Sequence, residues 1–482
     1  MPNAIAYLVL ALWPFACLAM FRRMSLERAL IWSILGGYLL LPPLTEFNLP
    51  LVPAMDKTTL PALSAALILV LSLKQRFALL PRFLPARILV LLFLLGTIPT
   101  VLTNGDPIAF QVLQNSEPIQ YLTWALPGLT LRDTLSVLIT QMLTLLPFLM
   151  ARQFLASETG MREMLIALVV GGLIYSLPSL FEIRFSPQLN IWIYGFFQHS
   201  WEQMVRNGGF RPIVFLPHGL WLAFFVVTAL ISAAALFRLA PPEQRTRNIV
   251  IVVWLAVLLV LCKSLGSLVY GIVLTPLVLF TSGKTQVRVA ILFAVVAVTY
   301  PMLRNGHLVP LDAILAQAEN ISAERAQSLG YRFSNEELLL DRAAEKPLFG
   351  WGGWGRSLVR HSESGEILSI PDGRWIIVFG VYGWAGYIAE FGLLALPVFL
   401  TGWQMRGRRG AQVSPYVVPL VLMLAITMID MLLNATLIPF TWMMAGAILG
   451  HLEKARAAVP RRVLFPDGTA MEPARDERRT VL

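Results

Sequence analysis

Residues 213–237 read IVFLPHGLWLAFFVVTALISAAALF, a stretch in which His218 is the only ionisable side chain. A run of about 20 apolar residues is long enough to cross the hydrocarbon core of a bilayer as a helix. Similar blocks recur along the chain, so that 57% of its 482 residues are apolar and only 14% are charged. Because a soluble domain carries about 25% charge, the composition excludes a cytosolic enzyme and a disordered chain. The sequence predicts an all-α polytopic membrane protein.

Hydropathy predicts about 12–13 transmembrane helices along the chain. The sequence does not fix where one span ends and the next begins within 248–282 and within 414–451, so both 12 and 13 spans are compatible with it. The predicted spans are 4–21, 28–45, 57–73, 86–103, 132–151, 162–180, 213–237, 248–264, 266–282, 288–303, 375–402, 414–433 and 436–451.

Basic residues are concentrated in alternate short connections between these spans. They follow the first, third, seventh, ninth and eleventh spans, as Arg22, Lys74, Arg238, Lys284 and Arg406 illustrate. Membrane proteins retain such residues on the cytoplasmic side, so we expect the N-terminus outside and the C-terminal tail inside. The net charge of +10 is then a consequence of topology, and no nucleic-acid partner is expected.

The three longest connections all fall on the predicted outer side, at 104–131, 181–212 and 304–374. Loops held on a rigid scaffold are where binding and chemistry concentrate. The predicted organisation is a membrane domain of about ten spans (1–303), a large outer loop with short helices (304–374), about three further spans (375–451) and a disordered cytoplasmic tail (452–482).

Two helices are predicted inside the large outer loop. The first runs from Pro310 to Leu329 and is stopped by Gly330, since glycine commonly ends helices. The second begins at Ser334, with Glu337 as its capping-box partner, and ends before Pro347. A glycine-rich stretch follows, and such a stretch permits close backbone approach to a ligand or to another segment.

Polar side chains near the outer ends of the spans are the candidates for chemistry. Neither a D-x-D nor an H-E-x-x-H motif occurs, so no metal site is predicted. Glu390 and Asp430 lie within spans, where charge is costly; we interpret Glu390 as paired with another helix and Asp430 as hydrogen-bonded near Asn434. The candidates are Arg211, His218, Lys263, Arg332, Arg342, Trp351, Trp354, Arg356, Asp372 and Arg374.

Part of the chain resembles the bacterial O-antigen ligases and the O-antigen or exopolysaccharide polymerases. The stretch KPLFGWG at 346–352 is similar to the family's P-L-x-G-x-G turn, and Arg332 and Arg342 resemble the arginine and short helix before that turn. The row Gly380-x-x-Gly383-x-x-Gly386, interpreted as a helix-packing surface, is similar to the family's next span. The sequence SLG at 264–266 resembles its Ser-Arg-Gly turn.

The sequence departs from the family at two positions. Asp372-Gly373 stands where the ligases usually have a His-Asn pair, and Leu265 replaces the arginine of Ser-Arg-Gly. Lys263 is close enough in sequence to supply the missing charge. These departures weaken the assignment as a ligase in particular and leave a polymerase or another lipid-linked glycan transferase compatible.

The resemblance implies a GT-C-like glycosyltransferase in the bacterial inner membrane that works on the periplasmic face without cofactor or metal. Its donor would be a glycan on undecaprenyl diphosphate, and its acceptor another glycan or the lipid A-core. Membrane lipids and polysaccharide export or assembly proteins are the other expected partners.

The chemistry of this reaction suggests roles for the candidate residues. Guanidinium groups bind phosphate oxygens bidentately and stay charged, so Arg332 and Arg211 are predicted diphosphate clamps, with Lys263 and Arg342 next. Asp372 and His218 are the candidates for the base, although Asp372 is also placed to cap a helix. Contacts to the glycan or within the loop are predicted for Trp351, Trp354, Arg356 and Arg374.

Two other classes of function remain open on the sequence alone. A polysaccharide transporter or lipid flippase would be expected to show repeated halves and a midplane site, and neither is evident. A non-catalytic assembly component would use the large loop as a docking surface. Such a component predicts that substitution of the loop arginines leaves glycan transfer intact.

Overall fold

The computed structural model describes residues 1–48, 53–114, 120–206, 208–320, 322–406 and 413–457. Within this part of the chain, eight helices are long and apolar enough to cross a membrane, and three shorter helices are similarly apolar. Little sheet accompanies them. The prediction of a mostly helical, multi-pass membrane protein is confirmed.

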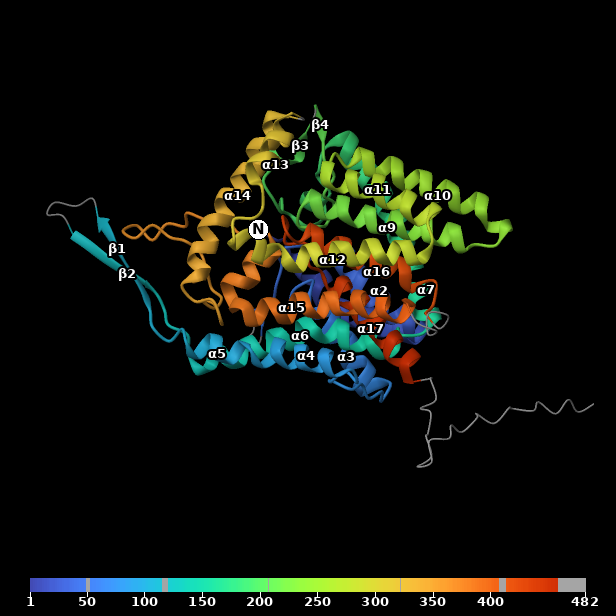
Figure 1. The fold of residues 1–482 in the computed structure, drawn as a ribbon, viewed down its shortest axis with the longest axis horizontal. Coiled ribbons are helices and arrows are strands. Elements are labelled where there is room, and N and C mark those ends of the chain that lie inside the picture. The colour runs from blue at the N-terminus through green and yellow to red at the C-terminus, as the bar shows by residue number, and fades with distance from the viewer. Residues whose placement is uncertain (49–52, 115–119, 207, 321, 407–412, 458–482) are drawn as a thin grey trace, which may run out of the picture.

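The described chain consists mostly of helices, with short two-stranded sheets among them (Figure 1). The first half of the chain forms α1 (Ala4–Arg23), α2 (Leu26–Leu40), α3 (Thr59–Leu67), η1 (Ile68–Ser72), α4 (Leu84–Leu95), α5 (Thr97–Leu102), β1 (Ile108–Gln114), β2 (Gln120–Leu126), α6 (Leu131–Phe154), α7 (Glu158–Phe185), α8 (Leu189–Tyr194), η2 (Glu202–Met204), β3 (Val205–Arg206), β4 (Gly209–Phe210) and α9 (Gly219–Leu239). The second half forms α10 (Pro242–Leu261), α11 (Leu265–Phe280), α12 (Gly283–Asn305), α13 (Leu311–Glu319), α14 (Ala323–Ala344), α15 (Arg374–Arg406), α16 (Val417–Asp430) and α17 (Pro439–Ala457).

Every predicted span coincides with a helix, when α3 is taken with η1 and α4 with α5. The agreement follows from the length of the apolar blocks, which is a local property of the sequence. α17 continues to Ala457, past the predicted end of the last span at 451. The rest of the predicted tail, 458–482, lies outside the described residues.

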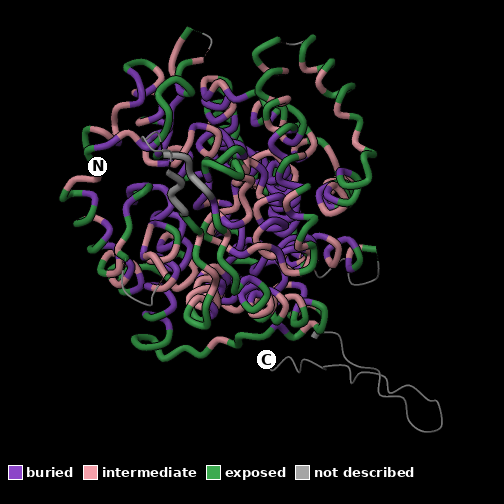
Figure 2. Tube along the Cα trace, turned by 90° about the vertical axis from the view of Figure 1, so that its left-hand side faces the viewer, coloured by how far each residue is buried: buried purple, intermediate pink, exposed green. Residues whose placement is uncertain are grey.

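The core of the bundle lies around α9 and α16, whose side chains are buried along most of their length. Figure 2 shows the buried residues gathered in the middle of the molecule and the exposed ones around them. α6 and α17 approach closely at two glycines: a Cβ at Gly446 would lie 2.1 Å from the Phe148 carbonyl oxygen, and one at Gly450 1.9 Å from that of Arg152. Small residues four apart allow such backbone contact between membrane helices.

The long connections gather at one end of the bundle. Figure 1 shows the β1–β2 hairpin and α14 at the left of the molecule, beyond the ends of the spanning helices. We call this the hairpin end. At the other end the last turn of α6 meets the segment before α4 and the end of α17, through Arg152, Ala78 and Glu453.

The large loop differs from the prediction at Gly330. α14 runs without a break from Ala323 to Ala344, so the predicted helix stop at Gly330 and the predicted new helix at Ser334 are both wrong. The Ser334 hydroxyl instead donates to the Gly330 carbonyl within the helix (3.0 Å). A glycine inside a helix costs only about 1 kcal/mol, and burial of the face of α14 that carries Phe333 and Leu340 outweighs this.

α15 is broken at Gly383, whose φ of 62° and ψ of −159° are not helical. Sixteen residues of continuous helix would separate Arg374 from Glu390 by about 24 Å. Their side chains nevertheless form two hydrogen bonds of 2.7 and 2.6 Å, so the chain must turn sharply at Gly383. The interpretation of the glycine row as a straight helix-packing face is wrong.

The glycine-rich stretch of the large loop completes the backbone hydrogen bonds that this break leaves open. The N–H groups of Trp351 and Gly352 each donate over 2.9 Å to the carbonyls of residues 380 and 381, and the carbonyls of residues 347 and 348 accept from residues 384 and 385. We call residues 347–352 the clasp. The stretch that carries the family resemblance therefore holds α15 in its bent form.

The clasp yields a prediction that compares two glycines. Gly350 has φ +67°, and a Cβ there would lie 2.5 Å from the backbone of Val381, whereas a Cβ at Gly353 would meet nothing within 4 Å. We expect Gly350→Ala to lower the free energy of unfolding by about 1–3 kcal/mol and Gly353→Ala to leave it nearly unchanged. Thermal unfolding of the two purified variants in one detergent checks this, and equal melting temperatures would contradict it.

Candidate functional site

Basic side chains from four separate segments converge at the hairpin end. Arg211 follows β4, Lys263 precedes α11 and Arg332 lies on α14. The Arg211 Nη2 donates to the Lys263 carbonyl (3.0 Å), and the Lys263 Nζ donates to the carbonyl of Arg206 (3.0 Å). Arg325 joins them, because its charge lowers the pKa of Arg211. We call these five residues the cationic cluster.

Arg211 is the most enclosed member of this cluster. Only 7% of its surface is exposed, and its side chain crosses Gly219, where a Cβ would lie 2.4 Å from the Arg211 Cδ. Its Nε has no hydrogen-bond acceptor among the residues that the structure describes. Burial, and then the charges of Arg206, Arg325 and Arg332, lower its pKa to about 10, so it stays cationic at neutral pH.

Arg332 lies where α14 meets the loop between α16 and α17. Its Nη1 donates to the Leu433 carbonyl (3.2 Å) and to the Asn434 Oδ1 (3.3 Å). Its Nε lies 3.7 Å from an Asp372 carboxylate oxygen, which is too far for a hydrogen bond. Arg332 and Asp372 line one cavity together with Ile370.

Asp372 is half-buried just before α15. Burial raises the pKa of its carboxyl group, and the positive charge of Arg332 opposes this effect. α15 begins two residues later, at Arg374. Within the described chain, no backbone N–H of this helix donates to the Asp372 carboxylate, so the structure does not support its alternative role as a helix cap. Its side chain lines the cavity beside Arg332. The role of Asp372 as the catalytic base remains a prediction.

The side chain of Asn434 is held by the carboxylate of Asp430 at the end of α16. The Asp430 oxygens accept from the Asn434 Nδ2 (3.0 Å) and from the Thr436 hydroxyl (2.6 Å), so the predicted bond between Asp430 and Asn434 is confirmed. The unwound loop that carries Asn434 is anchored again by the N–H of Arg374, which donates to Met431 and Asn434 carbonyls. Arg332 is thus oriented by a chain of hydrogen bonds that ends in α16.

His218 lies close to the cationic cluster but both of its ring nitrogens are occupied. Its Nδ1 accepts from the backbone N–H of Leu220 (2.8 Å), which makes it the N-cap of α9, and its Nε2 lies 3.0 Å from the Gln203 Oε1. Burial, then the nearby His199 and the charges of Arg211 and Arg332, lower its pKa to about 3. Arg211 and Arg332 are thus both within electrostatic reach of His218. His218 could serve as a base only if its hydrogen bonds to Leu220 and Gln203 were to break.

Arg342 lies apart from the cationic cluster. Its guanidinium carbon is 3.3 Å from the centre of the Trp351 ring, and its Nη1 pairs with Glu345 (2.8 Å). The partner is Glu345 and not the adjacent Asp341, because residues three apart face each other on a helix, whereas adjacent ones do not. Trp351 is held in place because its indole N–H donates to the Arg342 carbonyl (2.7 Å).

Two other predicted arginines are bound by protein groups. Arg356 is 2% exposed and donates to the carbonyls of Pro127 (2.7 Å) and Asp106 (2.9 Å), so it fixes the base of the β1–β2 hairpin. Arg374 is paired with Glu390 across the bend in α15. The prediction that Glu390 pairs with another helix is therefore wrong, because both residues belong to α15. Trp354 is 56% exposed and remains available for a ligand.

Sequence reasoning missed three residues of this site, namely Arg206, Arg325 and Asn434. Each lies close in sequence to a feature that had been recognised, but only the fold brings them to Arg211 and Arg332. A scan against protein-family models found no match, and a comparison with curated proteins found none either. The functional argument therefore depends on the geometry of the site.

The cationic cluster has fewer anions than cations around it. Among the described residues, Glu324 pairs with Arg206, and the carboxylates of Asp372 and Asp430 lie within electrostatic reach of Arg332. Arg211, Lys263 and Arg325 have no carboxylate partner within this part of the chain. Such an excess of fixed, partly buried positive charge favours a ligand with more than one negative charge.

Proposed function

We propose that this protein is an integral membrane glycosyltransferase that moves a glycan from an undecaprenyl-diphosphate carrier to an acceptor. The proposal includes a GT-C-like architecture of about 12–13 spans, a location in the bacterial inner membrane and a hairpin end that faces the periplasm. The family resemblance of residues 332–352 suggests this class of reaction, and the geometry of the cationic cluster supports it independently.

The observation that carries the proposal is the buried guanidinium of Arg211, which has no carboxylate partner among the described residues and lies within electrostatic reach of Arg332. A charged group this enclosed, with a free Nε and like charges around it, is costly unless an anion completes it. A diphosphate supplies several acceptor oxygens at once, and arginine matches them in a planar fork. A lipid carrier also explains why the cluster lies at the end of a membrane bundle.

The proposed reaction breaks one bond and forms one. The acceptor hydroxyl attacks the anomeric carbon, the bond from that carbon to the diphosphate oxygen breaks, and undecaprenyl diphosphate leaves with the electron pair. Arg211 and Arg332 stabilise the negative charge that develops on the diphosphate. The Asp372 carboxylate takes the proton of the acceptor hydroxyl.

The polysaccharide of a deletion strain tests this function. Loss of a ligase would leave long chains that are not attached to their acceptor, whereas loss of a polymerase would leave single repeat units on the lipid carrier. We expect one of these two phenotypes, and we expect the wild-type gene to reverse it. Analysis of glycan length and attachment by gel and mass spectrometry measures the outcome.

Two results would contradict the proposal. Unchanged surface polysaccharide would exclude this role in glycan transfer. Lipid-linked glycan that accumulates on the cytoplasmic leaflet would instead indicate a flippase, because a transferase acts only after the carrier has crossed the membrane.

A further inference from the structure

A second charged recess lies at the end of the bundle opposite the hairpin end. It is a groove of about 360 Å³ between the start of α4 and the last turns of α15 and α17. Its rim and walls include Arg82, Leu84, Leu400, Trp403, Leu449 and Arg456. None of these residues belongs to the cationic cluster, so the groove is independent of the proposed function.

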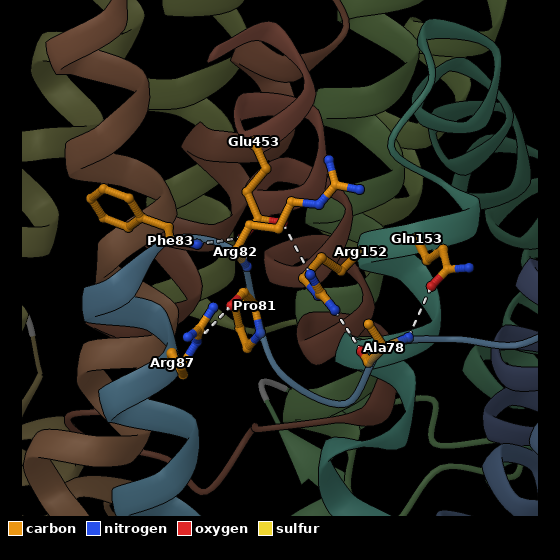
Figure 3. A network of polar contacts seen from close by, with 8 residues as sticks. All are labelled: Ala78, Pro81, Arg82, Phe83, Arg87, Arg152, Gln153 and Glu453. Atoms are coloured by element: carbon orange, nitrogen blue, oxygen red, sulfur yellow. Dashed lines mark hydrogen bonds and ion pairs between the residues drawn. The ribbon is translucent and has the colours of Figure 1, made fainter. Parts of the chain in front are cut away.

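The one carboxylate that lines this groove in the described chain is already neutralised. Glu453 pairs with Arg152 over 3.0 Å, and both side chains are buried. Its other oxygen accepts from the backbone N–H groups of Arg82 (2.7 Å) and Phe83 (3.0 Å). Figure 3 shows the Glu453 carboxylate between Arg152 and this stretch of backbone, while the guanidinium of Arg82 makes no marked contact.

The rim of the groove is therefore positively charged. Within the described residues, neither Arg82 nor Arg456 pairs its guanidinium with a carboxylate, and both are exposed. The Arg456 guanidinium lies over the rings of Phe83 (5.3 Å) and Trp403 (5.9 Å), which hold it at the mouth. The N-terminus of α4 begins at the same place and adds a partial positive charge.

The walls below this rim are apolar and partly exposed on the surface of the bundle. Leu449 and Leu452 form a fully buried floor, while Leu84 and Trp403 are 61% and 54% exposed. Tryptophan is typical of the depth at which lipid headgroups meet acyl chains. A ligand of this groove must therefore carry negative charge at one end and hydrocarbon at the other.

We propose that the groove binds an anionic phospholipid, with its phosphate between Arg82 and Arg456 and its acyl chains along Leu84, Leu400 and Trp403. Basic recesses between membrane helices on the cytoplasmic side are a known setting for such headgroups. The Arg152–Glu453 pair positions the recess, because it ties the backbone of residues 82 and 83 to the end of α17.

Native mass spectrometry of the full-length protein tests this site. The protein is released from detergent after titration with phosphatidylglycerol or, separately, with phosphatidylcholine. We expect retention of phosphatidylglycerol only, and we expect the double substitution Arg82→Gln/Arg456→Gln to weaken its apparent affinity about 30-fold, since each arginine near a lipid surface contributes about fivefold.

Two control variants accompany this measurement. Arg288→Gln removes an exposed arginine near the same end, at the start of α12, and should leave lipid binding unchanged. Arg82→Lys/Arg456→Lys keeps both charges and should retain most of the affinity, whereas a loss of fold would remove it. Equal retention of phosphatidylcholine, full binding by the glutamine variant, or displacement by glycerol phosphate at similar concentration would each overturn the proposal.

Discussion

Replacing Arg211 with glutamine is expected to lower the rate of glycan transfer by about 10²–10³-fold, the effect of removing one preorganised donor to a developing oxyanion. The substituted side chain cannot match the diphosphate with a charged fork, and the loss falls on the transition state, where the negative charge is largest. The measurement is transfer from a purified lipid-linked donor by protein in vesicles, with rate and donor affinity determined separately.

The same substitution is expected to leave the fold intact. Arg211 is desolvated and repelled by Arg206, Arg325 and Arg332, so a neutral side chain relieves this repulsion while it loses one hydrogen bond to the Lys263 carbonyl. A melting temperature close to that of the wild type, together with the loss of rate, identifies a functional role. A large drop in melting temperature with full specific activity of the folded fraction would contradict it.

Arg132→Gln serves as the matched control. Arg132 is exposed at the start of α6, near the hairpin end. If general positive charge at this end attracted the anionic donor, both variants would weaken donor binding alike. We expect only Arg211→Gln to lower the rate at saturating donor.

The sequence predicted the helices well because the length of an apolar block is visible without tertiary structure. The bend in α15 could not be predicted in the same way. Whether Gly383 continues a helix or breaks it depends on whether another segment bonds the freed backbone groups, and that segment, the clasp, lies about thirty residues earlier in the chain. Gly330 shows the reverse case, because burial of one face of α14 keeps the helix intact.

The sequence indicated the kind of residue to expect at the candidate site, but not which individual residues gather there. The sequence singles out charged residues near the outer span ends as a group, but it cannot distinguish Arg332, Arg356 and Arg374 from one another. Arg356 finds carbonyls at the base of the hairpin, and Arg374 finds Glu390 across the bend. Which arginine remains available to a ligand depends on these acceptors, and only the folded chain supplies them.

Asp372 yields the second prediction with a large expected effect. General-base catalysis contributes about 10²–10⁴-fold, so Asp372→Asn should lower the transfer rate by that factor and Asp372→Glu by less. In the wild type the base must be deprotonated, so the rate should fall as the pH drops through the pKa of Asp372, which burial holds above its ordinary value. The rate is measured across pH at saturating donor, and an unchanged acid limb in Asp372→Asn would exclude the assignment.

Arg332 provides an internal check on the sign of this effect. Its positive charge opposes the rise in the pKa of Asp372, so its removal in Arg332→Gln should raise that pKa further and move the acid limb to higher pH. We expect Arg332→Gln to be slower than the wild type, but a pH profile can still be recorded because it needs only relative rates. A shift to lower pH, or none, would mean that the titrating group is not the carboxylate that Arg332 faces, and the base would then have to be sought elsewhere in the cavity.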